Sequence, residues 1–162
     1  DMAAAERHFR EAHACFERTG YEWGTAHVLN NLGRVSLEQG NLDSAEDFLL
    51  QALERAKMLG DLDLLALARL NYGEVLLQRE QYEAVEEEVS AAVGHFTAAG
   101  NQWRRIDCLR LLGDLHTRTN SLDVAERFYT AALRVAEEIG AKTEERQIRQ
   151  RLAVLGSGDG AS

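Results

Sequence analysis

Five histidines are the first residues of this 162-residue chain that could do acid–base chemistry or bind a metal, because imidazole titrates near neutral pH. Their spacing supports neither role. His8 and His13 stand five residues apart, which splays them on one helix, and no His-Glu-x-x-His sequence occurs. His116 is expected between packed helices and His27 on a surface away from the apolar stripe. We therefore predict no metal site and no catalytic histidine.

The acidic and sulfur-containing residues do not form a catalytic arrangement either. Glu86, Glu87 and Glu88 make an acidic run, but successive residues of a helix point in different directions, so we expect a solvent-exposed face. Cys15 and Cys108 are too few for a disulfide framework and are expected to be reduced. We predict that the chain is not an enzyme and uses no cofactor.

The charge balance opposes two classes of partner. The chain has 27 acidic against 18 basic residues, a formal charge of −9, and a pI of about 5.0. Such a chain is repelled by nucleic acids and by anionic membranes, since both are polyanions. No apolar run approaches the roughly 18 residues that a membrane-spanning helix needs. We expect a soluble, cytoplasmic chain that binds neither nucleic acid nor membrane.

The elements that position these residues follow from an internal repeat of 40 residues. A first series of glycines has this spacing: Gly20, Gly60, Gly100 and Gly140. A second series of small residues shares the period: Gly33, Gly73 and Gly113, then Ala45, Val85 and Ala125, then Ala52, Ala92 and Ala132. Agreement between independent series indicates a repeat fold. The absence of proline and the abundance of Ala, Leu, Glu, Arg and Gln favour helix almost everywhere.

Each repeat is predicted to be a pair of helices. In the first repeat, apolar residues recur at helical spacing over 28–36 and again over 45–56, with a short polar stretch at 39–41 between them. The second glycine series falls inside the first helix, where Gly costs about 1 kcal/mol relative to Ala. We attribute it to close approach of the second helix at the equivalent small residues Ala52, Ala92 and Ala132. Consecutive pairs then stack and cover one another.

The stretch NNLGRVSLEQGNLDSAEDFLLQALERA, residues 30–56, resembles a tetratricopeptide repeat in its Leu-Gly pair, its small residue early in the second helix, the bulky residue one turn later and its further Ala. The resemblance covers residues 21–140 as three repeats and extends more weakly over 1–19 and 143–155. The chain departs from the common pattern in its 40-residue period, in lacking Trp before the Leu-Gly pair, and in lacking the closing Pro. It is most similar to the long-period variety found in polarity adaptors and bacterial regulators.

The resemblance implies an all-α fold, a right-handed α-solenoid of antiparallel helix hairpins. We predict a single domain over 1–155, with a half repeat at 1–20, full repeats at 21–60, 61–100 and 101–140, and a terminal helix at 141–155. Residues 156–162 are predicted to be a flexible tail. Because the chain opens inside a second helix, the apolar side chains of Ala5, Phe9, Ala12 and Phe16 are expected to be covered by a missing upstream segment or by a second copy, giving a homo-oligomer.

In tetratricopeptide repeats the face of the first helices that does not pack within the hairpin lines a concave groove, so the resemblance places the candidate binding residues there. Asn side chains on this face can pair with a peptide backbone, Arg can hold carboxylates, and Leu can seat an apolar anchor. The candidate residues are His27, Asn30, Asn31, Arg34, Leu67, Leu70, Asn71, Glu74, Asp107, Arg110, Leu111, Asp114, Arg118 and Arg151. An ordinary polar surface is the alternative.

These observations predict a non-catalytic protein–protein interaction module that binds a peptide or a partner segment in the groove. The first alternative is a ligand- or peptide-sensing regulatory segment of a larger transcriptional or signalling protein. The second, more remote alternative is an enzyme or a metal protein, for which no constellation of residues is assembled.

Overall fold

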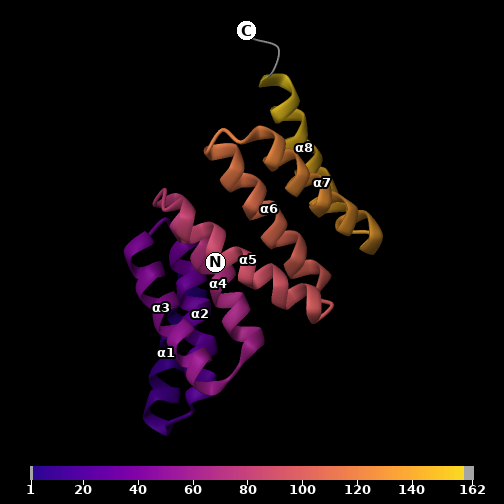
Figure 1. Ribbon diagram of the computed structural model, residues 1–162. Helices are drawn as coiled ribbons and strands as arrows, with labels where there is room; N and C mark the ends of the chain where they lie inside the picture. Colours follow the sequence, from indigo (N-terminus) through magenta and orange to yellow (C-terminus); the bar gives the residue numbers. More distant parts are fainter. Residues whose placement is uncertain (1, 159–162) are drawn as a thin grey trace. The chain divides into compact units, whose positions relative to one another are not determined.

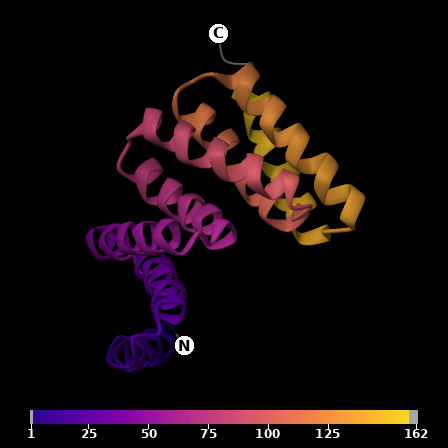
Figure 2. The same ribbon diagram turned by 60° about the horizontal axis from the view of Figure 1, so that its bottom comes forward.

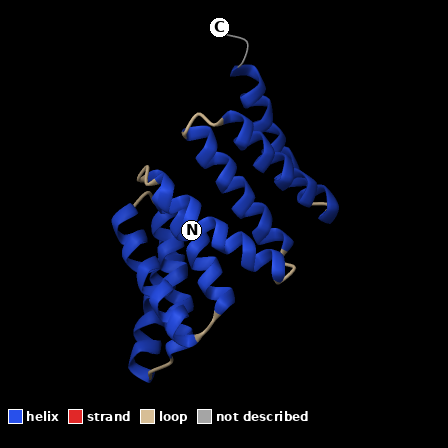
Figure 3. Ribbon diagram, viewed as in Figure 1, coloured by secondary structure: helices blue, strands red, loops and turns tan. Residues whose placement is uncertain are grey.

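The computed structural model describes residues 2–158, which form eight helices joined by short turns, with no strand among them (Figure 3). The predicted all-α fold is confirmed. The helices are α1 (Met2–Thr19), α2 (Glu22–Glu38), α3 (Leu42–Leu59), α4 (Leu62–Gln78), α5 (Tyr82–Ala98), α6 (Gln102–Arg118), α7 (Leu122–Ile139) and α8 (Lys142–Gly158).

The helices gather into two compact units, Asp1–Arg79 (unit 1) and Glu80–Ser162 (unit 2). In unit 1, α1 packs on α2, α2 on α3 and α3 on α4 as antiparallel neighbours, and α2 also contacts α4 (Figure 1). In unit 2, α5 packs on α6, α6 on α7 and α7 on α8, and α6 also contacts α8 (Figure 2). The predicted helix hairpins are therefore present. Their organisation as a single domain stays a prediction.

The first glycine series ends helices. Gly20, Gly60, Gly100 and Gly140 have φ angles of 66°, 68°, 70° and 70°, in the left-handed region that favours glycine. After the turn at Gly60, Asp61 caps the next helix, and its Oδ1 accepts a hydrogen bond of 2.9 Å from the backbone N–H of Leu64. Glycines at the 40-residue spacing therefore follow the second helix of each hairpin.

The second glycine series lies where two helices touch. A Cβ atom at Gly33 would stand 2.5 Å from Leu49 Cγ, and one at Gly113 would fall on the ring of Tyr129. Close approach of the second helix is confirmed at both positions. The predicted contact residue is wrong, because the second helix touches these glycines through Leu49 and Tyr129 rather than through Ala52 and Ala132. Ala52 instead belongs to a buried cluster with residues of α2 and α4.

The two ends of the chain differ from the interior. Helix α1 contains no fully buried residue, and its apolar side chains at Ala5, Phe9, Ala12 and Phe16 are half-buried. Association through this face stays a prediction. At the other end α8 reaches Gly158, so the predicted flexible tail is wrong at 156–158, which are helical, and residues 159–162 lie outside the described residues. Within 2–158 no helix is long and apolar enough to cross a membrane.

Candidate functional site

The fourteen candidate residues lie on the first helices of the hairpins, α2 and α4 in unit 1 and α6 and α8 in unit 2. Each half is therefore described by itself. Exposed candidates are Arg34 and Arg118. Half-buried candidates are His27, Asn31, Leu67, Glu74, Asp107, Arg110, Asp114 and Arg151. Buried candidates are Asn30, Leu70, Asn71 and Leu111.

The buried four correct part of the predicted surface, since each is only 2% exposed and cannot meet a partner. In unit 1, Asn71 Nδ2 on α4 donates a 2.9 Å hydrogen bond to Asn30 Oδ1 on α2. The physical reason is that α2 contacts α4 directly, and α6 contacts α8, so part of the polar face is used for packing between first helices. These two buried amides connect α2 to α4 and are not available to bind a peptide.

The unit 1 surface centres on an aromatic and acidic cluster at the start of α2. Trp23 Nε1 donates to Asp61 Oδ2 at 2.9 Å, and His27 Nε2 lies 3.6 Å from the same oxygen. The rings of Trp23 and His27 are 3.9 Å apart. The N–H of Leu64 is the main cause that lowers the pKa of Asp61, and the Trp23 indole adds to it. The cluster fixes the start of α4 against α2.

A second part of the unit 1 surface carries charge. Arg34 Nε pairs with Glu38 Oε1 on the same helix at 2.9 Å, and both side chains are about half exposed. Asn31 on α2 and Leu67 and Glu74 on α4 are half-buried. A single exposed pair of this kind is worth about 0.3–0.5 kcal/mol, so Arg34 can exchange Glu38 for a partner group at little cost.

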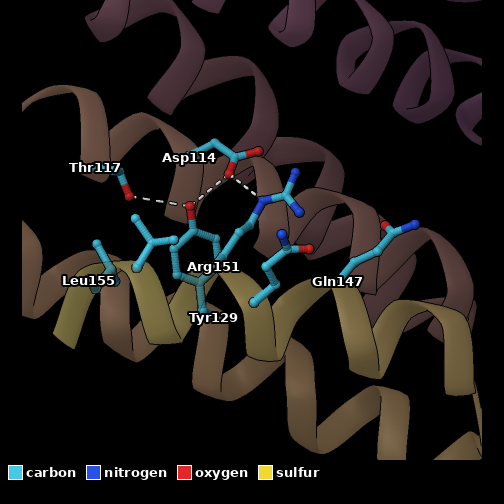
Figure 4. Close-up of a pocket in the computed structure, with 8 residues that line it drawn as sticks. Asp114, Thr117, Tyr129, Gln147, Arg151 and Leu155 are labelled. Carbon is cyan, nitrogen blue, oxygen red and sulfur yellow. Dashed lines mark hydrogen bonds and ion pairs between the residues drawn. The ribbon is translucent and has the colours of Figure 1, made fainter. Parts of the chain in front are cut away.

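In unit 2 a pocket of about 410 Å³ lies between α6, α7 and α8 (Figure 4). Its lining comes from Asp114, Thr117, Tyr129, Gln147, Gln150, Arg151, Val154 and Leu155. Asp114 is the centre of the polar network. Its Oδ1 accepts from Tyr129 Oη at 2.6 Å and from Arg151 Nε at 2.8 Å, and its Oδ2 accepts from Arg110 Nη1 at 3.0 Å.

Charged side chains meet at one edge of this pocket. The guanidinium groups of Arg110 and Arg151 both pair with the carboxylate of Asp114. Burial raises the pKa of Tyr129 to about 12, and its hydrogen bond to Asp114 acts in the same direction. Tyr129 is therefore a neutral donor at physiological pH. Three of the predicted residues, Arg110, Asp114 and Arg151, meet here.

The other candidates for chemistry are held in structural contacts. Burial raises the pKa of the Cys108 thiol to about 12, so this thiol stays protonated at neutral pH. His116 is half-buried, stacks on Phe128 with ring centres 5.3 Å apart, and lies 3.2 Å from a Glu86 carboxylate oxygen. Among residues 2–158, no three His, Cys, Asp or Glu side chains are close enough to hold a metal ion.

Sequence reasoning missed several residues of both surfaces. Tyr129, Thr117, Gln147 and Gln150 line the pocket in unit 2, and Trp23 and Asp61 form the cluster in unit 1. The missed signal for Tyr129 was its position: it is equivalent to the apolar residues Leu49 and Val89, and alone among the three it carries a hydroxyl. A polar group in an apolar position needs a partner, which here is Asp114.

The chain is similar to known proteins in sequence and in fold. Residues 1–58 match the family model of the tetratricopeptide repeat. Tetratricopeptide-repeat sequence therefore covers the N-terminal part of the chain. The predicted resemblance is thus confirmed, and the crystal structure of BtubC (BKLC) from P. vanneervenii shows the same fold, with a TM-score of 0.69 and 15% identity over 98% of this chain and 77% of that one.

The repeat domain is also similar to one regulatory protein. It is 27% identical over 187 aligned residues to "Regulatory protein AfsR" from Streptomyces griseus. This match covers 95% of this chain but 19% of the relative, so the chain spans about a fifth of the length of the curated relative.

Proposed function

We propose that this tetratricopeptide repeat domain is a non-catalytic protein-interaction module whose first helices bind a peptide or a segment of a partner protein. The observation that carries the proposal is the row of charged and polar side chains that stay half or fully exposed on the first helices of both units. Tetratricopeptide repeat domains generally bind proteins, and stacked helical repeats present extended surfaces for this purpose. The residues that would bind are the exposed and half-buried members of the predicted set.

The two units offer different chemistry to such a partner. Unit 1 presents Arg34 on α2, and Glu74 and the aliphatic side chain of Leu67 on α4. Unit 2 presents Asp107, Arg110 and Arg118. Guanidinium groups hold carboxylates with two parallel hydrogen bonds, so acidic positions in the partner segment are expected to face these arginines.

Calorimetric titration of a captured partner against matched variants tests this function. Arg34→Ala and Arg118→Ala are expected to weaken binding by about 1–2 kcal/mol each without changing the melting temperature, because both side chains are exposed. Glu87→Ala changes an equally exposed residue on the second helix α5 and is the control, with an expected effect below about 0.5 kcal/mol. If Glu87→Ala loses binding and both arginine variants keep it, the partner uses the second helices and the proposed surface is wrong.

A second candidate function is favoured by the similarity to the regulatory protein over nearly the whole repeat domain. As a regulatory segment, the first helices would bind another segment of the same, longer polypeptide, or a signal molecule that displaces that segment. Capture experiments separate the two functions, since a partner encoded in the same polypeptide supports the regulatory segment and a partner encoded elsewhere supports the interaction module.

A further inference from the structure

The exposed sides of the second helices carry opposite charges in unit 1 and unit 2. On α3 the exposed Asp47 and Glu54 form what we call the acidic face. On α7 the equivalent positions, two periods later, carry the exposed Arg127 and Arg134, which form the basic face. We propose that the basic face of one copy of this chain binds the acidic face of a second copy. This contact uses the second helices and does not depend on the function proposed for the first helices.

The arginines of the basic face are available to a partner. Neither Arg127 nor Arg134 has a hydrogen-bond or ion-pair partner within residues 2–158. Arg149, which is also exposed in unit 2, instead pairs with Glu137 at 2.6 Å. A separation of seven residues is close to two helical turns, so both arginines lie on one side of α7, about 10 Å apart along its axis.

The carboxylates of the acidic face have the same spacing and are also available. Asp47 accepts a 3.1 Å hydrogen bond from the Gln51 amide, and neither Asp47 nor Glu54 is held in an ion pair in the described part of the chain. Two helices that lie side by side can therefore align both charge pairs at once. Opposite charges at equal spacing steer two surfaces together and fix their register.

An apolar side chain on the acidic face matches a hollow on the basic face. Leu50 lies between the two acids of α3 in sequence and is 46% exposed. A hollow of about 410 Å³ on α7 is lined by Glu126, Arg127, Thr130, Ala131 and Arg134. Thr130 and Ala131 are short and half-buried, so a leucine side chain can enter between the arginines. Glu126 is the acidic member of this lining, and the two arginines outnumber it.

The exposed side of α5 does not offer the same match. Its residues at the positions of Asp47, Leu50 and Glu54 are Glu87, Ser90 and Gly94. It therefore has one carboxylate and no apolar side chain for the hollow. A contact between two different faces is heterologous and builds rings or open chains, so we expect dimers and larger species whose share grows with protein concentration.

Sedimentation of the full chain at different salt concentrations is the first test. Raising the ionic strength from about 0.01 M to about 1 M shortens the Debye length from about 30 Å to about 3 Å. Exposed charge pairs are individually weak and are screened by salt. The association constant is therefore expected to fall at least about tenfold over this range. Association through the apolar side chains of α1 would not weaken with salt.

Charge reversal identifies the two faces. Arg127→Glu with Arg134→Glu, or Asp47→Lys with Glu54→Lys, is expected to weaken self-association at least about tenfold, because like charges then face each other. All four substitutions in one chain are expected to restore it to within about threefold of the wild type, since the charges are again opposite. An equimolar mixture of the two reversed chains is expected to associate as well.

Two control variants change the net charge equally at other exposed positions. Arg7→Glu with Arg18→Glu on α1 matches the reversal on α7, and Glu83→Lys with Glu87→Lys on α5 matches the reversal on α3. Both controls are expected to keep the association constant within about twofold at the same salt concentration. All of these positions are exposed, so circular dichroism melting should show every variant folded.

The outcomes decide the proposal without reference to the first helices. Loss of association in both reversed chains, with recovery in the fourfold variant and in the mixture, would establish the contact. A wild-type chain that stays monomeric at low salt would overturn it. Reversals that have no effect, a fourfold variant that does not recover, or controls that lose as much association as the reversals would overturn it too. None of these results bears on whether Arg34 and Arg118 bind a partner.

Discussion

The two units place different residues at the same positions of the repeat, and this changes how their first helices are joined. Asn30 and Asn71 in unit 1 are equivalent to Arg110 and Arg151 in unit 2, two periods later. In unit 1 the two amides bond each other and are buried. In unit 2 the longer arginines meet on Asp114 and stay partly exposed beside a pocket of about 410 Å³. Short neutral groups close the contact between first helices in unit 1, while long charged groups leave a pocket beside the contact in unit 2.

A second pair of equivalent positions follows the same rule. The glycine of the first helix faces Leu49 in unit 1 and Tyr129 in unit 2. Leu49 only fills space, while Tyr129 fills space and carries a hydroxyl to Asp114. The aromatic ring therefore supports the polar network of unit 2, which has no counterpart at the corresponding place in unit 1.

The largest expected effect comes from replacing the glycines that face Leu49 and Tyr129. Gly113→Leu should destabilise the chain by about 3 kcal/mol, because the new side chain would overlap the ring of Tyr129, which is wedged in the core. Gly33→Leu should cost about 2 kcal/mol, since Leu49 can change rotamer. The measurement is denaturant unfolding.

Gly94→Leu is the control for both substitutions. No atom lies within 4 Å of a Cβ built at Gly94, so the better helix propensity of Leu should leave stability unchanged or raise it by up to about 0.8 kcal/mol. A Gly113→Leu variant as stable as Gly94→Leu would show that the helices do not approach closely at Gly113.

The next effect tests whether unit 1 is closed by its amide pair. Asn71→Ala should cost about 2 kcal/mol, because it leaves the buried Asn30 amide without its partner. Arg151→Ala should cost about 1 kcal/mol or less, since water can replace its half-exposed contact with Asp114. The double variant Asn30→Ala with Asn71→Ala should cost less than the sum of the single changes. Equal costs for Asn71→Ala and Arg151→Ala would remove the distinction between a closed and an open contact.

A pH titration separates the units by the groups that they bury. In unit 2 the pKa of Tyr129 is raised from 10.0 to about 12, so its contribution to stability is complete below pH 10 and is lost as pH rises toward 12. Tyr129→Phe should reduce this alkaline loss of stability by about 1–2 kcal/mol. Part of the loss should remain, because the pKa of the Cys108 thiol is also raised to about 12.

In unit 1 the shifted group acts at the opposite end of the pH scale. The pKa of Asp61 is lowered from 3.8, so its contribution to stability is present at neutral pH and is lost as pH falls through the lowered value.

Hydrogen exchange at individual amides measures the alkaline loss in each unit. It should show unit 2 opening first in alkali, because Tyr129 and Cys108 both lie in unit 2. If the alkaline loss is the same in wild type and Tyr129→Phe, the Tyr129 hydroxyl is not buried in the folded chain.

The smallest effect concerns equivalent turns. The three equivalent turn residues have positive φ angles, which are 76° at Gly40 in unit 1 and 60° at Glu80 and 57° at Asn120 in unit 2. Glu80→Gly should raise stability by about 1 kcal/mol, and Asn120→Gly by only a few tenths, because Asn tolerates the left-handed region better than Glu. Gln39→Gly, at a φ of −82°, should give no gain. Thermal unfolding measures all three, and a loss at Glu80→Gly would mean that its side chain makes a stabilising contact.

The fold could be predicted from the sequence because the same pattern of small and apolar residues occurs in each of the three repeats. Helix ends at Gly60 or Gly140 and close approach at Gly33 or Gly113 depend on local backbone and on residue size, which periodicity reveals. Whether Asn71 faces a partner or another helix depends on how far α2 and α4 overlap, and the spacing of apolar residues does not contain that distance. The pocket in unit 2 was missed for the same reason, since Tyr129 and Gln147 come together only through the packing of three helices.

Photo-cross-linking tests the proposed partner surface most directly. A photoreactive amino acid is placed at position 67 on first helix α4, at position 118 on first helix α6, or at position 87 on second helix α5, and each chain is exposed to extract from its own cell. Partner binding on the first helices predicts that positions 67 and 118 yield the same cross-linked protein and that position 87 yields none. Cross-linking of that protein from position 87 alone would contradict it.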